Sequence, residues 1–409
     1  MTNAKKAALI IWGVLAALFI WLNCASTVGI VLARKSPAGS FALGYHTAAA
    51  EAAIAVAGLA AAPQTNRAVI AAHARAALRR EAINVDAVVA LGTATALTNH
   101  MLAAEHMFAY AEQLSRRNIP TQLWLIENAV QQGKIEPALV HYDRAMSVSV
   151  STRALLLPVL ATAAATPTVA QPLARLLSRR PLWWPAAIEQ FIASQDPVHV
   201  LPPAVAALRL RPNIPEERAY LVSAMRRLAD AGAAAAAFSM YRAAQPRFAV
   251  IALLRAGDFE KVGDLPPFDW SLADGANVSG VIQPGGVGSG SALFLSAEGG
   301  GQGEVARQVL LLPSSATYRF MATTGNVPQE LTDRPRIVVS CLSSEKSVLL
   351  DQAFATGGGH GARVAGTITI PPGCTSQLLQ IVMHASLDGA GAGAMPWIDN
   401  IQIVPAGRL

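Results

Sequence analysis

The composition of the chain changes once, near Arg255, and this change constrains the fold more than any other feature. Before it the chain is rich in alanine and leucine, with apolar residues at helical spacing. After it the chain is rich in glycine, serine, valine and threonine, in short runs separated by turn residues. The sequence therefore predicts a multidomain protein, with a helical region at 44–254 and a β-domain at 255–409.

The length and the charge narrow the classes of function. The chain has 409 residues, which is enough for two or three domains. Its net charge is +6, but the arginines are scattered through the predicted helices and form no basic run or recognition motif. We therefore expect no nucleic-acid partner.

The N-terminal segment is apolar between two basic pairs. Lys5 and Lys6 precede an apolar run at 7–33, and a second basic pair ends it. As a helix this run would be roughly 40 Å long, against about 30 Å for the hydrocarbon core of a bilayer. One interpretation is an uncleaved signal anchor, and another is a signal peptide cleaved near Cys24. A buried helix of a soluble domain is the third. The run continues past Cys24, which favours the anchor.

The anchor interpretation predicts a location for the whole chain. Residues 1–6 would be a short cytoplasmic N-terminus, 7–33 a single transmembrane helix, and 34–43 a linker with proline and glycine. The two basic pairs are equal, so the orientation depends on the cysteines of the β-domain, which suit an oxidising compartment. We expect a single-pass protein of the inner membrane, with its bulk exported to the periplasm.

A spacing of 34 residues recurs in two adjacent helical segments. The small and aromatic residues that repeat are Ala104 with Ala138, Phe108 with Tyr142, and Ala111 with Ala145. A small residue lets two helices approach closely, and an aromatic residue four positions later lies on the same face. Glycines such as Gly133 are placed to end the first helix of each pair.

This pattern resembles the tetratricopeptide repeat. The resemblance implies an α-solenoid over residues 44–254 that presents a concave face to a protein partner. The tryptophan and proline of the family's pattern are mostly absent from this chain, so unrelated helical hairpins are the alternative.

The β-domain contains regularly spaced runs of strand-forming residues. The candidate strands are 268–272, 292–296, 306–312, 318–323, 337–342, 348–354, 364–370, 378–384 and 396–404. Such a series predicts a β-sandwich or jelly roll. Cys341 and Cys374 both fall at strand ends, where they can come within bonding distance. We predict a disulfide between them if the domain is exported, with two buried free thiols as the alternative.

The first and last strands of this domain carry a second resemblance. The segment 257–260 is followed by Trp270, and the chain closes with the segment 397–403. Both segments resemble strands of jelly-roll carbohydrate-binding modules, in which they lie close together and often hold a structural calcium ion. The resemblance implies Glu260 and Asp399 as the first candidate ligands, followed by Asp258. The alternative is that these carboxylates cap turns and pair with nearby groups.

The same resemblance raises the question of sugar binding, which needs exposed aromatic rings that stack on pyranose faces. The candidate rings are Trp270, Tyr318 and Trp397. Most aromatic residues of this domain have strand neighbours typical of core positions, and only 6% of the chain is aromatic. Glycan binding and a purely structural sandwich therefore both remain as interpretations.

The sequence offers no catalytic constellation. The glycine-rich segment 286–290 precedes a predicted strand rather than a helix, so it does not indicate a phosphate loop. Asp269 and Asp274 lie near each other in sequence, but two carboxylates alone do not make a glycosidase. We expect no enzymatic activity.

The combination resembles accessory proteins of polysaccharide assembly and export. It predicts a membrane-anchored envelope scaffold, whose helical repeats bind a protein partner and whose sandwich contacts glycan or another subunit. The alternative is a glycan-binding protein whose repeats act only as a spacer.

Overall fold

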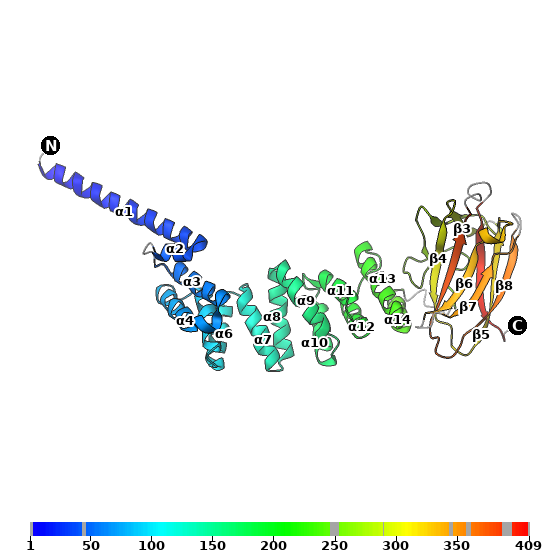
Figure 1. Cartoon of the computed structure of the whole chain (residues 1–409), viewed down its shortest axis with the longest axis horizontal. Helices are drawn as coiled ribbons and strands as arrows, with labels where there is room; N and C mark the ends of the chain where they lie inside the picture. Colours follow the sequence, from blue (N-terminus) through cyan, green and yellow to red (C-terminus); the bar gives the residue numbers. More distant parts are fainter. Residues whose placement is uncertain are drawn as a thin grey trace. The chain divides into compact units, whose positions relative to one another are not determined.

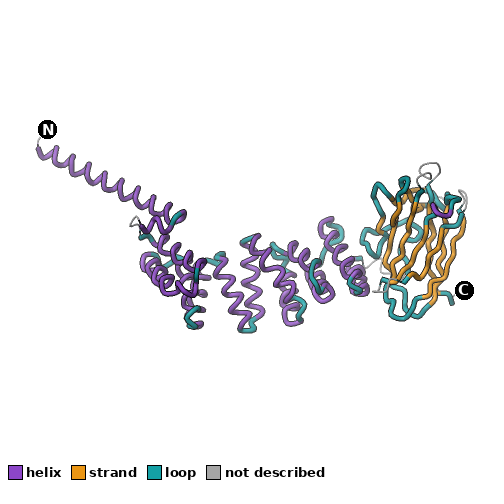
Figure 2. Tube along the Cα trace, in the orientation of Figure 1, coloured by secondary structure: helices purple, strands orange, loops and turns teal. Residues whose placement is uncertain are grey.

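The computed structural model describes residues 3–42, 46–245, 253–288, 290–342, 347–356, 361–386 and 395–407. Helices occupy the chain up to residue 244 and strands occupy it from residue 271, as Figure 2 shows. The predicted order of a helical region followed by a two-sheet β-sandwich is confirmed. The chain divides into two compact units, Met1–Leu156 and Leu157–Leu409, so the last helices share a unit with the sandwich.

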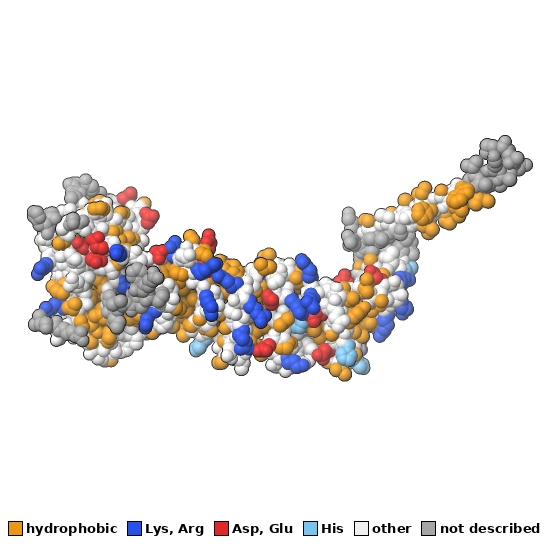
Figure 3. Space-filling view, turned by 180° about the vertical axis from the view of Figure 1, so that it is seen from behind, with side chains coloured by type: hydrophobic (Ala, Val, Ile, Leu, Met, Phe, Trp, Pro, Cys, Tyr) orange, Lys and Arg blue, Asp and Glu red, His pale blue; other side chains and the backbone are white. Residues whose placement is uncertain are grey.

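The N-terminal segment forms helix α1 (Asn3–Lys35), which is followed by α2 (Pro37–Ala42). Apolar side chains of α1 such as Trp12 and Phe19 are exposed. Figure 3 shows hydrophobic side chains along this helix. In the second half of α1, the side-chain amide of Asn23 donates a hydrogen bond to the carbonyl of Phe19.

No helix in the part of the chain that the structure describes is both long enough and apolar enough to cross a membrane. The predicted transmembrane anchor at 7–33 and the inner-membrane location are therefore wrong. The predicted linker at 34–43 contains the short helix α2. Pro37 is the first residue of α2, a position where its missing N–H removes no helical hydrogen bond.

The first unit continues with helices joined by short turns (Figure 1). They are α3 (Ala48–Ala61), α4 (Pro63–Arg80), α5 (Val85–Ala96), α6 (Met101–Leu114), α7 (Ile119–Gln131), α8 (Ile135–Val148) and the first part of α9 (Val150–Ala163). All six residues of the 34-residue spacing are buried. Gly133 follows α7 with a φ of 69°, a left-handed conformation that ends the helix at little cost for glycine.

The spacing extends to the helix caps. Asn84 precedes α5 and accepts the N–H of Ala87, and Asn118 precedes α7 and accepts the N–H of Thr121. Positions 84 and 118 are again 34 residues apart. The repeat therefore includes the start of the first helix in each pair, a feature that the small and aromatic residues alone did not indicate.

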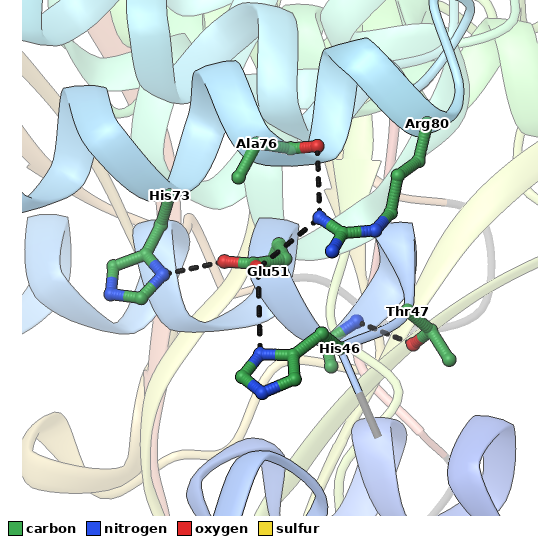
Figure 4. Close-up of polar contacts among 7 residues, drawn as sticks. His46, Thr47, Glu51, His73, Ala76 and Arg80 are labelled. Atoms are coloured by element: carbon green, nitrogen blue, oxygen red, sulfur yellow. Dashed lines mark hydrogen bonds and ion pairs between the residues drawn. The ribbon is translucent and has the colours of Figure 1, made fainter. Parts of the chain in front are cut away.

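The cores of these helices are built mainly from alanine, and a buried carboxylate lies among them. Glu51 on α3 is 4% exposed. Its Oε2 lies 2.6 Å from Nδ1 of His73, and its Oε1 lies 3.4 Å from Arg80 and 3.8 Å from Nδ1 of His46 (Figure 4). Two side chains of α4, His73 and Arg80, thus contact the carboxylate on α3.

The helical part of the second unit contains α10 (Pro167–Leu177), α11 (Trp184–Ile192), α12 (Pro197–Leu208), α13 (Pro215–Asp230) and α14 (Ala234–Ala244). Proline is the first residue of α10, α12 and α13, which explains why this stretch is cut into short helices. The segment after α14 packs against it: the Tyr241 hydroxyl donates to Oδ1 of Asp269 at 2.7 Å. Burial raises the pKa of both groups.

The strands of the sandwich are β1 (Ser271–Leu272), β2 (Val278–Pro284), β3 (Ser291–Ala297), β4 (Gln302–Leu310), β5 (Thr317–Gly325), β6 (Arg336–Cys341), β7 (Val348–Ala353), β8 (Ala362–Thr369), β9 (Gln377–His384) and β10 (Trp397–Pro405). They form two five-stranded antiparallel sheets, in the orders β1-β4-β9-β6-β7 and β2-β3-β10-β5-β8. Strand β2 was not predicted, because Gly280 and Pro284 weaken its pattern.

The core of the sandwich consists of large apolar side chains from both sheets, among them Phe320, Ile337 and Ile381. Cys341, at the end of β6, forms a disulfide with Cys374, in the turn before β9, across a Cα–Cα distance of 5.8 Å. Both cysteines are buried, so the bridge ties this end of the sheet to the core.

Candidate functional site

The three aromatic residues predicted to stack on sugars lie inside the sandwich. Trp270 and Tyr318 are each 4% exposed, and Trp397 is 2% exposed. The Trp397 ring packs so tightly that a Cβ added at Gly325 would lie 2.3 Å from it. These rings therefore cannot form a stacking platform, because their faces are covered by core side chains and backbone.

The segments that suggested a calcium site do lie close together. The Gly257 carbonyl accepts the Ile401 N–H at 2.8 Å, so the opening segment of the domain runs beside β10. Asp399 accepts the N–H of Asn400 at 2.6 Å and that of Val287 at 3.2 Å. Glu260 accepts the N–H of Ser291 at 2.6 Å.

These carboxylates do not assemble into a metal-ligand set. Among the described residues, no three His, Cys, Asp or Glu side chains are arranged to hold a metal ion. Burial raises the pKa of Asp399, and the charges of Glu260 and Asp258 raise it further. The carboxylates accept hydrogen bonds from backbone N–H groups, so they fit the role of turn anchors better than that of calcium ligands.

A groove with a mainly polar lining lies on the outer face of the first sheet. It has a volume of about 550 Å³ and crosses β4, β9 and β6 beside the short 3₁₀ helix η2 (Leu331–Asp333). Its lining consists of Gln302, Gly303, Glu304, Leu331, Thr332, Arg334, Arg336, Gln380, Val382, Met383 and His384. None of these residues was predicted to be functional.

Strand register brings these side chains together. Along β9, Leu379 and Ile381 are buried in the core, so the alternating Gln380 and Val382 face outward. Val382 pairs with Glu304 on β4 and with Arg336 on β6. Residues far apart in sequence therefore form one row across the sheet.

The polar groups of the floor are connected. The Gln380 amide donates to Oε2 of Glu304 at 2.5 Å, and Arg307 lies 3.5 Å from Oε1 of the same carboxylate. Arg336 donates through Nε to Oδ1 of Asp351 on β7 at 2.7 Å. The floor thus offers an amide, a carboxylate and a guanidinium with defined orientations.

The rim of the groove is held by the segment around η2. Asp333 accepts the backbone N–H and the hydroxyl of Ser386 at 3.0 and 2.8 Å, which fixes η2 against the end of β9. Arg334 donates to the carbonyls of Pro328 and Gln329 at 3.1 and 2.5 Å. These bonds orient the Arg334 guanidinium at the groove.

The helical part of the second unit has a groove of a different character. It has a volume of about 560 Å³ and lies among α12, α13 and α14. Its lining is apolar apart from Arg209 and Ser239: Pro202, Val205, Ala206, Leu210, Leu221, Ala236, Met240, Ala243 and Ala244.

No family model matches the chain, and no curated protein matches it. Among solved structures, the module CBM4 is 16% identical, covers 37% of this chain and 99% of its own length, and has a TM-score of 0.28. The CBM22-1 xylan-binding domain of Paenibacillus barcinonensis Xyn10C is 14% identical and covers 37% of this chain and 93% of its own, with a TM-score of 0.26.

The enzymatically active domain of the bacteriophage CBA120 tailspike protein 4 is 12% identical and covers 38% of this chain, with a TM-score of 0.28. The match spans only 21% of the tailspike chain. All three TM-scores are below 0.3, and the two-sheet architecture of this domain rests on its own strand pairing rather than on these similarities.

Proposed function

We propose that the β-sandwich binds a polysaccharide in the groove over β4, β9 and β6. The observation that carries this proposal is the convergence of Gln380, Glu304 and Arg336 on one shallow groove. Each sugar hydroxyl can both donate and accept a hydrogen bond. Amide, carboxylate and guanidinium groups each have at least two donor or acceptor atoms, so one such group can bond two neighbouring hydroxyls. A groove crossing a sheet suits an extended chain better than a compact small molecule.

We propose that this binding is not followed by cleavage. Glycoside hydrolysis ordinarily needs two carboxyl groups on opposite sides of the scissile bond. Of the described residues that line the groove, Glu304 is the single carboxylate, and it is occupied by Gln380 and Arg307.

An affinity-gel or calorimetric titration of the full chain with a panel of polysaccharides tests the binding. We expect saturable binding that Gln380→Ala weakens and that a chelator leaves unchanged. The matched control is Gln402→Ala, which changes an exposed glutamine on β10 of the other sheet. Unaltered binding by the Gln380 variant, or no binding to any glycan by a folded chain, would refute the proposal.

A second candidate function is protein binding by the helical region. The apolar groove among α12, α13 and α14 favours it, with Arg209 exposed at its edge. We propose that this groove takes an amphipathic helix of a partner, whose apolar face meets Met240 and whose acidic residue meets Arg209. The 34-residue spacing of residues and caps in α5–α8 supports a tetratricopeptide-like array, an architecture that commonly binds proteins.

Two substitutions distinguish this second proposal from the alternative in which the helices act only as a spacer. Met240→Glu would place a charge in the groove and abolish capture of a labelled acidic amphipathic peptide, whereas Arg242→Glu outside the lining would not. If Met240→Glu leaves capture unchanged, the peptide does not bind in this groove. No capture by the unmodified chain would favour the alternative in which the helices only space the sandwich.

A further inference from the structure

We propose that the sandwich groove is selective for acidic polysaccharide, with the carboxylate of a uronic acid bound by Arg334 and Arg336. This inference rests on the proposed function and names its substrate class. None of the described residues that line the groove is Trp, Tyr or Phe. Stacking on a sugar ring therefore contributes little, and affinity must come from hydrogen bonds and charge.

Glu304 is the single carboxylate among the described residues of the lining, and it repels a bound anion only weakly. Glu304 lies 3.5 Å from Arg307 and accepts a hydrogen bond from Gln380. Its charge is thus compensated within the sheet. The other charged groups of the lining are Arg334 and Arg336, and Arg336 is paired with Asp351 on β7. Arg334 is therefore the charged group of the lining that has no ion-pair partner among the described residues.

Arg334 is oriented without being neutralised. It donates to the backbone carbonyls of Pro328 and Gln329, and no carboxylate of the described residues forms an ion pair with it. A guanidinium carries five N–H donors, so these bonds leave donors for a ligand. Because its position is already fixed, binding loses little side-chain entropy.

Arg336 supplies the second cation. It uses Nε for Asp351, while its side chain remains 43% exposed. A planar guanidinium matches a carboxylate through two parallel bonds, which a neutral hydroxyl cannot reproduce. A uronic acid presents one such carboxylate on each sugar residue. Two arginines along one groove therefore fit a chain of uronic acids.

Polygalacturonate and its fully methyl-esterified form make a matched pair of probes, because they differ in charge but share a backbone. We expect the full chain to bind polygalacturonate at least tenfold more tightly, with an affinity that falls as salt is added. Arg334→Ala should weaken this binding about tenfold, the effect of losing a charge-assisted hydrogen bond. The control Arg319→Ala removes an exposed arginine of β5 on the other sheet and should change nothing.

Three outcomes would overturn the inference. Equal binding of the methyl ester, still weakened by Gln380→Ala, would leave the proposed function standing without charge selectivity. Equal binding of dextran sulfate would indicate capture of any polyanion rather than of a carboxylate. If the chain melts cooperatively, and is therefore folded, but binds neither acidic nor neutral polysaccharide, the proposed function is refuted as well.

Discussion

The helical region and the sandwich bury polar side chains in different ways. In the helices, buried carboxylates bond to other side chains: Glu51 to His73 and Arg80, and Glu217 to Arg211 and Arg180. In the sandwich, buried polar side chains bond mainly to backbone. Gln377 bonds both the N–H and the carbonyl of Leu312, and Asp399 accepts the N–H of Val287.

The difference follows from where backbone groups are left open. A helix satisfies its own N–H and C=O groups except at its ends, so a buried side chain there must find another side chain. The loops between antiparallel strands leave unpaired backbone groups, which buried amides and carboxylates can bond. Stability should therefore depend on pH more in the helices, and on loop anchoring and large core side chains in the sandwich.

The largest expected effect concerns core size. Phe320 in β5 is fully buried between the two sheets. Phe320→Ala should lower the free energy of unfolding by about 3–5 kcal/mol, because a large cavity remains. Ala74→Gly in α4, also fully buried, should cost only about 1 kcal/mol. Calorimetry of the full chain measures both, and similar losses would mean that the two cores do not differ as described.

The next effect concerns Glu217 in α13. Arg211 and Arg180 lower the pKa of this carboxyl from 4.5 to about 2, with the hydrogen bond from Arg211 as the largest cause. A lowered pKa means that the carboxylate stabilises the fold fully above about pH 4.5 and loses this effect as the pH falls to about 2. Glu217→Gln should cost up to about 3 kcal/mol at pH 7.

This loss should shrink in melting experiments below about pH 4.5. The exposed neighbour Glu216 provides the control, since Glu216→Gln removes an equal charge without a buried pair. A difference between wild type and Glu217→Gln that stays constant from pH 7 to pH 3 would contradict the assigned pairing.

A smaller effect is expected at Gln377 in β9. Gln377→Ala leaves the N–H and carbonyl of Leu312 and the carbonyl of Cys374 without their partner, which should cost about 1–3 kcal/mol. In contrast to the Glu217 variant, this loss should be the same from pH 4 to pH 8. The control Gln402→Ala changes an exposed residue on β10 and should leave the free energy of unfolding unchanged. A loss at Gln377 that varies with pH would contradict the difference drawn between the helices and the sandwich.

The smallest effect tests the repeat. Asn84→Ala removes the side-chain acceptor for the Ala87 N–H and should cost about 1 kcal/mol. Asn118→Ala, one 34-residue interval later, should cost a similar amount, since Asn118 caps α7 in the same way. Asn84→Asp keeps the acceptor and should melt close to wild type. Unequal losses at the two positions would show that the caps are not equivalent.

The sequence alone determined the order of the architecture, because the responsible signals are local. Helical periodicity before Arg255 and short strand-forming runs after it depend on neighbours within a few residues. Gly133 ended a helix as predicted, since only nearby backbone geometry is involved. The prediction of a transmembrane helix in the apolar N-terminal run was wrong. It was based on the length of the run, and no described helix is both long enough and apolar enough to cross a membrane.

The tertiary structure alone decided which side chains are available to a ligand. Trp270 and Trp397 have the right chemistry for sugar binding, but packing between two sheets buries both. Glu304, Arg336 and Gln380 carry no motif, and they meet only because β9 pairs with β4 on one side and with β6 on the other. Strand pairing joins residues distant in sequence, and a shift by one residue would turn each to the opposite face. The site therefore depends on register, which no local pattern encodes.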